Sequence, residues 1–343
     1  MVISRRAALK TLAGLPLVSL LPAQERTPPS PLLPERLQPG DKVGLINPAG
    51  RIDKRETLKD IEDTLRDLKL VPVRGNHLRD QYGYLAGTDA DRAEDIHRFF
   101  RDESVKALLA ARGGWGCNRL LPLLDYDLIR SHPKIVLGYS DITSLLVALH
   151  ARTGLVTFHG PVGISTWNAF TRYYVQKVLF EGRAVTFRND HPAPVKEPGL
   201  TDFQVITPGT ARGRLWGGNC SVLSALIGTG YLPDPTDTIL FLEEVEEEPY
   251  RIDRMLTQFK LAGILDKLAG FIWGQCTRCE AEHPDRSLSL ADLMQDHIAP
   301  LGIPAFSGFL TGHIENKFTL PIGLPVTLEA DRGRVTLLQP AVR

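Results

Sequence analysis

The sequence predicts an α/β protein in which a mainly parallel sheet with flanking helices is followed by a smaller C-terminal α+β domain. In the first half, short apolar runs alternate with helical stretches, the pattern of a parallel sheet covered by helices. Periodicity is then poor before a second set of strands and helices begins. At 343 residues, 43% of them hydrophobic, the chain can bury a core for two domains. We place the first domain at 40–164, a linker at 165–210 and the second domain at 211–343.

The elements of the first domain follow from apolar periodicity. The first helix shows an apolar face at Leu58, Ile61, Leu65 and Leu68. We expect strands at 43–46, 107–110, 134–137 and near 155, and a second helix over 89–100.

The second domain is predicted in the same way. The glycine-rich segment from Gly213 to Asn219 is interpreted as the opening of a helix that runs through Ile227. We further expect a strand at 239–242, a helix over 250–262, a strand at 270–273 and a β-rich end after Pro325.

The N-terminus has the features of an export signal. Ser4-Arg5-Arg6-Ala7-Ala8-Leu9-Lys10 resembles the twin-arginine motif, and a moderately apolar stretch follows it. Residues 1–23 carry three positive charges and no negative one. We expect this signal peptide to send the protein to the periplasm, with 24–39, which holds five prolines, as a linker.

Composition narrows the class of function. The 40 basic and 40 acidic residues balance, and no basic stripe indicates a nucleic-acid partner. The sequence contains no run of 18 apolar residues, so no membrane span is predicted. Cys276 and Cys279 form a C-x-x-C without a second pair at zinc spacing, so a small disulfide or inert thiols are expected, with Cys117 and Cys220 buried. No metal or cofactor site is expected.

Gly138-Tyr139-Ser140-Asp141-Ile142-Thr143 is the strongest chemical signal. It places Ser140 on a tight turn between a strand and a helix with an apolar stripe, where the hydroxyl points into solvent and the first helical N–H groups can hold a developing negative charge. The turn resembles the G-x-S-x-G nucleophile motif, with Ile142 in place of the last glycine. A plain helix cap is the other interpretation.

A second glycine-rich loop, Arg112-Gly113-Gly114-Trp115-Gly116, follows the neighbouring strand. Glycine lets backbone N–H groups approach an oxyanion closely. Ligands of parallel sheets bind at the carboxyl ends of the strands, where this loop and Ser140 both lie. We therefore expect the oxyanion to be held by the backbone N–H of Asp141 with that of Gly113 or Gly114.

A serine nucleophile needs a base and a group that orients the base. His159, at the end of the next strand, and His313, after Gly312, are the two candidates that local pattern leaves open. Among the acidic residues, Glu243 and Glu244 end an apolar strand, and strand alternation sends them to opposite faces. Only one of the two glutamates can therefore face the site.

Five segments together resemble the LD-carboxypeptidase family of serine peptidases, which also includes the microcin C self-immunity peptidase. They are R-G-G-W-G, G-Y-S-D-I-T, L-E-E, P-Y-R-I-D-R-M-L and G-H, and the resemblance runs from about Gly40 to about Leu337. It implies a flavodoxin- or amidotransferase-like first domain, a homodimer, and a triad of Ser140, Glu243 and His313. Glu244 stands where the family usually has aspartate.

The resemblance also implies the substrate, a murein tetrapeptide from which the terminal D-alanine is removed. Microcin-immunity-like hydrolysis of another peptide or aminoacyl amide, or non-catalytic binding of cell-wall peptide, are the alternatives. A carboxypeptidase must recognise a free carboxylate, for which Arg112, Arg251 and Arg254 are candidates. Trp216 and Asn219 would suit a peptide-binding cleft, with a core tryptophan and a helix cap as the other interpretations.

Overall fold

The computed structural model describes residues 31–52, 58–188 and 202–343. The predicted signal peptide, the start of the predicted linker and the loop around His191 lie outside the described residues. Residues 31–343 form one compact unit. Within the described part of the chain, no helix is long and apolar enough to cross a membrane.

The first sheet has the predicted parallel order. Among the described residues it contains six strands in the order β12-β5-β4-β3-β1-β2, of which β12 alone is antiparallel to its neighbour. The strands are β1 (Lys42–Ile46), β2 (Val71–Arg74), β3 (Val105–Ala110), β4 (Ile135–Gly138), β5 (Thr157–His159) and β12 (Leu320–Ile322). All residues of β4 are buried, as expected for a strand covered on both faces.

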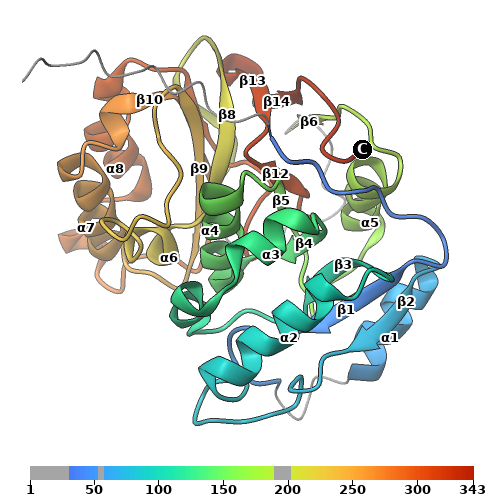
Figure 1. Ribbon diagram of the computed structural model, residues 1–343. Coiled ribbons are helices and arrows are strands. Elements are labelled where there is room, and N and C mark those ends of the chain that lie inside the picture. The colour runs from blue at the N-terminus through green and yellow to red at the C-terminus, as the bar shows by residue number, and fades with distance from the viewer. Residues whose placement is uncertain (1–30, 53–57, 189–201) are drawn as a thin grey trace, which may run out of the picture. The chain divides into compact units, whose positions relative to one another are not determined.

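Helices cover this sheet (Figure 1). They are α1 (Leu58–Asp67), α2 (Asp89–Arg101), α3 (Tyr126–Ser131), α4 (Thr143–Thr153) and α5 (Ala169–Val175). Helix α2 begins after Thr88, whose side chain accepts a hydrogen bond from the Asp91 N–H. Helix α4 contacts β4 and β5 on one side and β8 of the second sheet on another, so it is buried almost all round.

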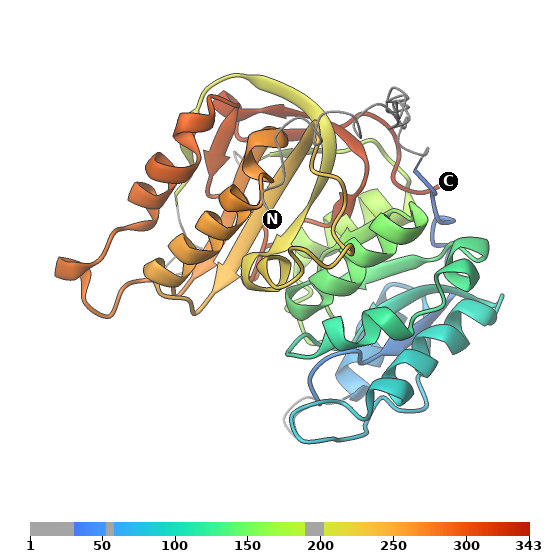
Figure 2. The same ribbon diagram turned by 60° about the vertical axis from the view of Figure 1, so that its left-hand side comes forward.

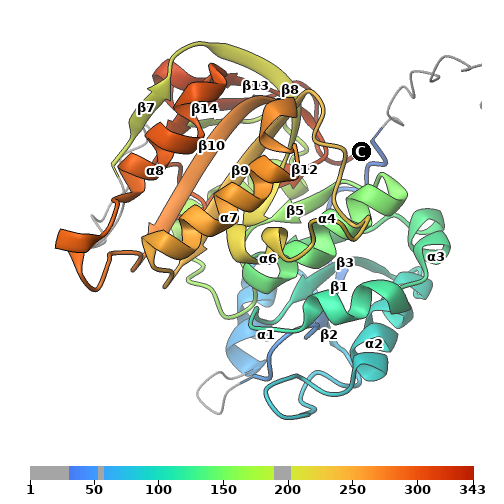
Figure 3. The ribbon, with the colours of Figure 1, turned by 90° about the vertical axis from the view of Figure 1, so that its left-hand side faces the viewer.

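The second sheet is larger than expected. It has eight strands in the described residues, in the order β6-β14-β13-β8-β9-β10-β11-β7, with β8 to β11 parallel. The strands are β6 (Thr186–Arg188), β7 (Gln204–Thr207), β8 (Thr210–Asn219), β9 (Thr238–Val245), β10 (Leu268–Thr277), β11 (Ala305–Ser307), β13 (Pro325–Glu329) and β14 (Arg334–Leu337). Helices α6 (Cys220–Ser224), α7 (Pro249–Leu261) and α8 (Leu290–His297) lie along one face of it (Figures 2 and 3).

Most predicted elements are present, and the prediction for Gly213–Asn219 was wrong. This segment is the second half of strand β8, and the helix begins only at Cys220 and ends at Ser224. A Cβ added at Gly217 would lie 1.9 Å from the Phe241 carbonyl oxygen, so the glycine permits close strand packing instead of a loop.

The two predicted linkers contain ordered structure. Helix α5 and strands β6 and β7 fall inside 165–210, and Leu32 pairs with Leu155. Strand β12, from the C-terminal half of the chain, belongs to the first sheet. The domain limits 40–164 and 211–343 stay a prediction.

Candidate active site

Ser140 sits on the predicted tight turn, directly after β4 and in a short 3₁₀ turn (Ser140–Ile142) that leads into α4. Its φ is +64°, a left-handed conformation that costs a non-glycine residue about 1–2 kcal/mol. A Cβ added at Gly113 would lie 2.8 Å from the Ser140 Cβ and 3.6 Å from the Asp141 nitrogen. The glycine-rich loop is therefore packed against the serine and the start of its helix.

Three side chains from distant parts of the chain meet at this turn. The His313 Nε2 lies 3.0 Å from the Ser140 Oγ, and the His313 Nδ1 lies 2.9 Å from the Glu243 Oε2. Ser140 follows a strand of the first sheet, Glu243 lies in β9 of the second sheet, and His313 is in the loop after β11. The structure thus brings together the serine, the glutamate and one of the two candidate histidines in a hydrogen-bonded chain.

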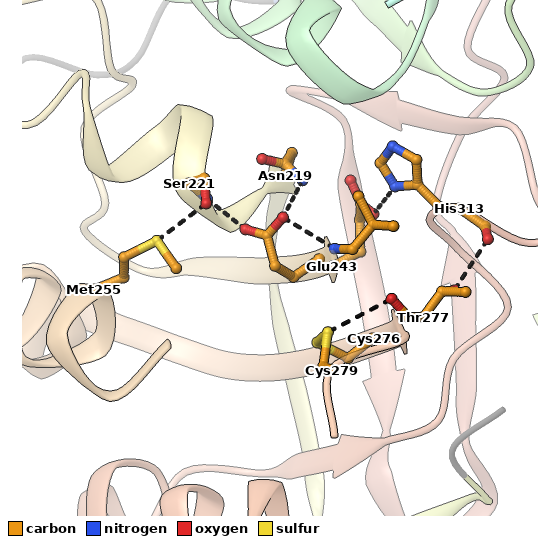
Figure 4. The surroundings of a disulfide bond; sticks show 10 residues. Asn219, Ser221, Glu243, Met255, Cys276, Thr277, Cys279 and His313 are labelled. Atoms are coloured by element: carbon orange, nitrogen blue, oxygen red, sulfur yellow. Dashed lines mark hydrogen bonds and ion pairs between the residues drawn. A yellow bond between two sulfur atoms is a disulfide. The ribbon is translucent and has the colours of Figure 1, made fainter. Parts of the chain in front are cut away.

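The Glu243 carboxylate is fully buried, and Figure 4 shows it facing the His313 ring. Burial alone would raise the pKa of Glu243, but the charge and hydrogen bond of His313 hold it below its usual range. The carboxylate is therefore ionised at neutral pH. A buried anion hydrogen-bonded to Nδ1 fixes the tautomer that leaves Nε2 free to accept a proton from the serine.

His159, the other candidate base, lies on the far side of the same carboxylate. Its Nε2 is 3.9 Å from the Glu243 Oε1, and its Nδ1 is 3.3 Å from the Thr311 Oγ1. Burial lowers the pKa of His159 to about 4, so the ring is neutral at pH 7. His159 therefore lies beside the Glu243 carboxylate, and it is His313, not His159, that reaches the Ser140 hydroxyl.

Glu244 points to the opposite face of β9, as strand alternation predicted. It accepts hydrogen bonds from the Asn219 Nδ2 (2.8 Å), the Ser221 N–H (2.8 Å) and the Val245 N–H (3.0 Å). Burial, and then the charge of Glu243, raise the pKa of Glu244. Glu244 anchors the start of α6 and does not reach the serine.

Cys276 and Cys279 form a disulfide beside the site (Figure 4). The turn that it closes contains Thr277, whose Oγ1 donates a 3.0 Å hydrogen bond to the His313 carbonyl oxygen. The disulfide turn therefore helps to hold the backbone of the histidine. Cys117 and Cys220 are buried free thiols, as expected, and burial raises the pKa of both.

Asp141 has a role that the sequence did not reveal. Its carboxylate accepts a 2.7 Å hydrogen bond from the Cys117 N–H, at the end of the glycine-rich loop. Burial raises the pKa of Asp141 to about 6. The residue after the serine thus ties the loop of Gly113 and Gly114, the predicted oxyanion donors, to the turn of Ser140.

The predicted substrate-binding residues differ in their exposure to solvent. Arg112 is partly exposed and its Nη1 donates a 2.9 Å hydrogen bond to the Arg51 carbonyl oxygen. Trp216 and Asn219 are buried, and the cleft role for them stays a prediction. The Trp216 Nε1 donates to the Thr238 Oγ1 at 2.8 Å, and Asn219 caps α6 by accepting from the Val222 N–H. These contacts are the ones expected from the alternative interpretation, in which Trp216 is a core tryptophan and Asn219 a helix cap.

Two further groups of charged side chains have partners of their own. Arg251 and Arg254 are on helix α7, each 5.7 Å from the Tyr250 ring centroid, and Arg251 also pairs with Glu247. His77, Asp80 and Asp91 place one ligand atom each within 4.8 Å of one another. The imidazole already bonds Asp80 at 2.7 Å, and exposed acidic groups of this kind are common without an ion.

A serine, histidine and buried carboxylate in this geometry, on an α/β fold, define a serine hydrolase. Comparison with known proteins specifies the family. The profile of the LD-carboxypeptidase N-terminal domain matches residues 43–160, and that of the C-terminal domain matches residues 212–328. The chain belongs to the LD-carboxypeptidase family and is an enzyme of the carboxypeptidase class.

Three relatives illustrate the family. The probable murein peptide carboxypeptidase of Bacillus subtilis (strain 168) is 40% identical over 299 residues, 84% of this chain and 89% of that protein. The structure of a muramoyltetrapeptide carboxypeptidase from Oxalobacter formigenes superimposes with a TM-score of 0.74 at 27% identity, covering 86% of this chain and 97% of that one. The microcin C7 self-immunity protein MccF of Escherichia coli is 26% identical over 335 residues, 90% of this chain and 96% of that protein.

Proposed function

We propose that this protein is a serine LD-carboxypeptidase that removes the terminal D-alanine from murein tetrapeptide stems. The observation that carries the proposal is the chain of hydrogen bonds from Ser140 through His313 to the buried Glu243, starting at a serine with φ +64°. The names of the Bacillus and Oxalobacter relatives support murein peptides as the substrate.

In the proposed mechanism, the Ser140 Oγ attacks the carbonyl carbon of the scissile amide while the His313 Nε2 takes its proton. Glu243 holds the imidazole and stabilises the imidazolium that forms. His313 then passes the proton to the nitrogen of the departing D-alanine, leaving an acyl-serine. Water, deprotonated by His313, attacks this ester and releases the shortened peptide and free Ser140.

The developing oxyanion needs N–H donors beside the serine. We assign this role to the backbone of Asp141 with that of Gly113 or Gly114, because the glycine-rich loop packs directly on Ser140. Removing one such donor typically costs about 10²–10³ in kcat. The hydrogen bond from the Cys117 N–H to the Asp141 carboxylate fixes the position of this loop relative to Ser140.

Recognition of the substrate carboxylate requires cationic or N–H donors near the scissile bond. Arg112 is the proposed residue, since it precedes Gly113 and remains partly exposed. Arg112→Lys would keep the charge but lose the planar fork, and we expect KM to rise more than kcat falls.

The test is mass spectrometry of the purified protein with L-Ala-γ-D-Glu-meso-diaminopimelyl-D-Ala, beside Ser140→Ala. Loss of one D-alanine with the native protein only is the expected result. Release by both proteins would remove Ser140 from the nucleophile role. Release by neither would reject the murein substrate and favour microcin-immunity-like amide hydrolysis, as the relation to MccF allows, or peptide binding without catalysis.

Export and dimerisation are further parts of the proposal. The twin-arginine-like motif at Arg5 and Arg6 would place the enzyme in the periplasm, where murein lies. Fractionation of cells that express the full chain or an Arg5→Lys/Arg6→Lys variant tests the first point. Light scattering of the mature protein tests the expected homodimer.

A further inference from the structure

Two exposed aromatic side chains, Tyr84 and Trp115, form a platform beside the proposed active site. They are 63% and 67% exposed and pack edge-to-face with ring centroids 6.5 Å apart. Tyr82, on the same loop as Tyr84, is 61% exposed. Large aromatic rings left in water side by side are typical of a binding surface.

The platform is fixed to the catalytic region by backbone hydrogen bonds. The Arg51 N–H donates to the Tyr84 carbonyl oxygen (3.2 Å), and the Gly50 N–H donates to the Gly113 carbonyl oxygen (3.1 Å). The loops that follow β1, β2 and β3 are thereby joined at the carboxyl edge of the sheet, the edge that bears Ser140.

A buried arginine strengthens this arrangement. The Arg92 Nη1 donates to the Pro48 carbonyl oxygen (2.5 Å) and to the Gly116 carbonyl oxygen (3.1 Å). Arg92 thus holds the loop of Trp115 against the loop after β1. The platform is a preformed surface, which lowers the entropic cost of binding.

The distance to the scissile bond suits the far end of a stem peptide. Trp115 is two residues from Gly113, which packs on Ser140, so their Cα atoms are within about 7 Å. Three extended residues upstream of the scissile bond span roughly 10 Å. In murein the next group is the lactyl ether and pyranose ring of N-acetylmuramic acid.

We propose that Tyr84 and Trp115 form a carbohydrate subsite that stacks on the pyranose ring of the N-acetylmuramoyl group and makes the enzyme prefer sugar-linked stem peptides to free ones. The inference rests on the proposed function. Aromatic faces are electron-rich and attract the C–H groups of a pyranose face. The Asp89–Arg119 ion pair lies close to Tyr82 and Tyr84 and offers hydrogen-bond partners for the hydroxyl groups of the sugar.

A second protein surface fits the platform less well. Fully buried interface cores are depleted of charged residues, and specific interfaces bury about 1,200–2,000 Å². Here two rings are bordered by charged and polar side chains, including Arg119 and the hydrogen-bonded pair Arg51 and Gln81. A single sugar ring needs only such a small aromatic face with a polar rim.

Direct binding gives the first test. Calorimetry of Ser140→Ala with N-acetylmuramoyl-tetrapeptide and with free tetrapeptide should show a Kd roughly tenfold lower for the sugar-linked ligand. Adding Trp115→Ala should abolish most of this ratio, Tyr84→Ala should reduce it about threefold, and Trp115→Phe should retain most of it. Tyr173→Ala, a control at a 48% exposed tyrosine on helix α5, should leave the ratio unchanged.

Fluorescence supplies an independent readout. Of the four tryptophans, Trp167, Trp216 and Trp273 are buried, so a change in emission on adding the sugar-linked ligand should come from Trp115. Trp115→Phe should lose this optical change while binding persists in calorimetry. An emission change that survives Trp115→Phe would contradict stacking on this ring.

Turnover separates this inference from the proposed function. The ratio of kcat/KM for sugar-linked over free tetrapeptide should fall in Trp115→Ala as the binding ratio does. If neither substrate releases D-alanine but the binding preference depends on Trp115, the proposed function fails and the subsite stands. Equal binding of both ligands, or a preference unchanged by Trp115→Ala, overturns the subsite. A change of oligomeric state in Trp115→Ala with an unchanged ratio also overturns it, in favour of an interface between copies.

Discussion

The two sheets prepare their share of the active site by different physical means. The first sheet presents Ser140 through backbone geometry: a buried strand, a left-handed turn and a glycine loop packed against it. The second sheet presents Glu243 through electrostatics: a fully buried carboxylate kept ionised by His313. The first sheet thus contributes a strained backbone turn and the second a buried charge. Substitutions in the two sheets should therefore change kcat and the free energy of unfolding in different proportions.

The largest effect is expected at the strained serine. Ser140→Gly should lower kcat by roughly 10⁵-fold or more, because it removes the nucleophile. The same change should raise the free energy of unfolding by up to about 1 kcal/mol, since glycine accepts φ +64° without strain. Turnover and urea unfolding measure the two effects.

Ser140→Ala provides the control for this prediction. It removes the same hydroxyl but keeps a Cβ in the left-handed turn, so it should be equally inactive without the gain in stability. Equal stability of the glycine and alanine variants would show that the turn stores no strain.

The second effect compares two adjacent carboxylates of the other sheet. Glu243→Gln should reduce kcat by about 10⁴-fold, because an amide no longer fixes the imidazole tautomer or stabilises the imidazolium. Glu244→Gln, on the opposite face of the same strand, should change kcat by less than about tenfold, since Glu244 bonds Asn219, Ser221 and Val245 and does not reach the serine. A similar loss of kcat in both variants would contradict a specific role for Glu243, because it would show that any change in this strand impairs catalysis.

The third prediction concerns the buried carboxyl group of Asp141, next to the nucleophile. Burial raises the pKa of Asp141 from 3.8 to about 6, so the folded state favours the protonated form. Its contribution to stability is present below pH 3.8 and is lost as the pH rises through about 6. Asp141→Asn lacks this titration, so from pH 4 to pH 7 its unfolding free energy should improve relative to wild type by on the order of 2–3 kcal/mol.

Urea unfolding of both proteins at a series of pH values provides the measurement for Asp141. A constant difference between wild type and Asp141→Asn across this range would mean that the carboxylate is not desolvated. Asp95→Asn is a useful comparison, because burial also raises the pKa of Asp95, whose carboxylate accepts a hydrogen bond from the Asn76 N–H.

The smallest effect is expected at the disulfide turn. Replacing Cys276 and Cys279 by alanine should lower the unfolding free energy by about 2 kcal/mol, the entropy of so short a loop. kcat should fall less than threefold, because Thr277 still donates to the His313 carbonyl oxygen. Reducing agent should destabilise the native protein and leave the alanine variant unchanged; a response of the variant would point to another thiol.

Local patterns in the sequence were sufficient for much of the fold. The parallel sheet, helices α1, α2 and α7, and the turn at Ser140 follow from periodicity and from the residues that favour a tight turn. Helix α8 was missed although Ser289 and Asp292 form a capping box, a signal that the sequence contains. The glycines of β8 were misread, because a glycine that serves close strand packing looks like a loop glycine until its neighbour Phe241 is known.

The sequence by itself determined the family, the candidate nucleophile and the presence of two glutamates of which one could serve. It could not choose His313 over His159 without the resemblance, since a histidine at the end of a strand and a histidine in a loop can both reach the serine. Only the tertiary structure decided that His313 lies between Ser140 and Glu243 while His159 stands behind the carboxylate. The physical reason is that strand order and the packing of α4 between two sheets set distances across 70 to 173 residues of chain, which no local propensity encodes.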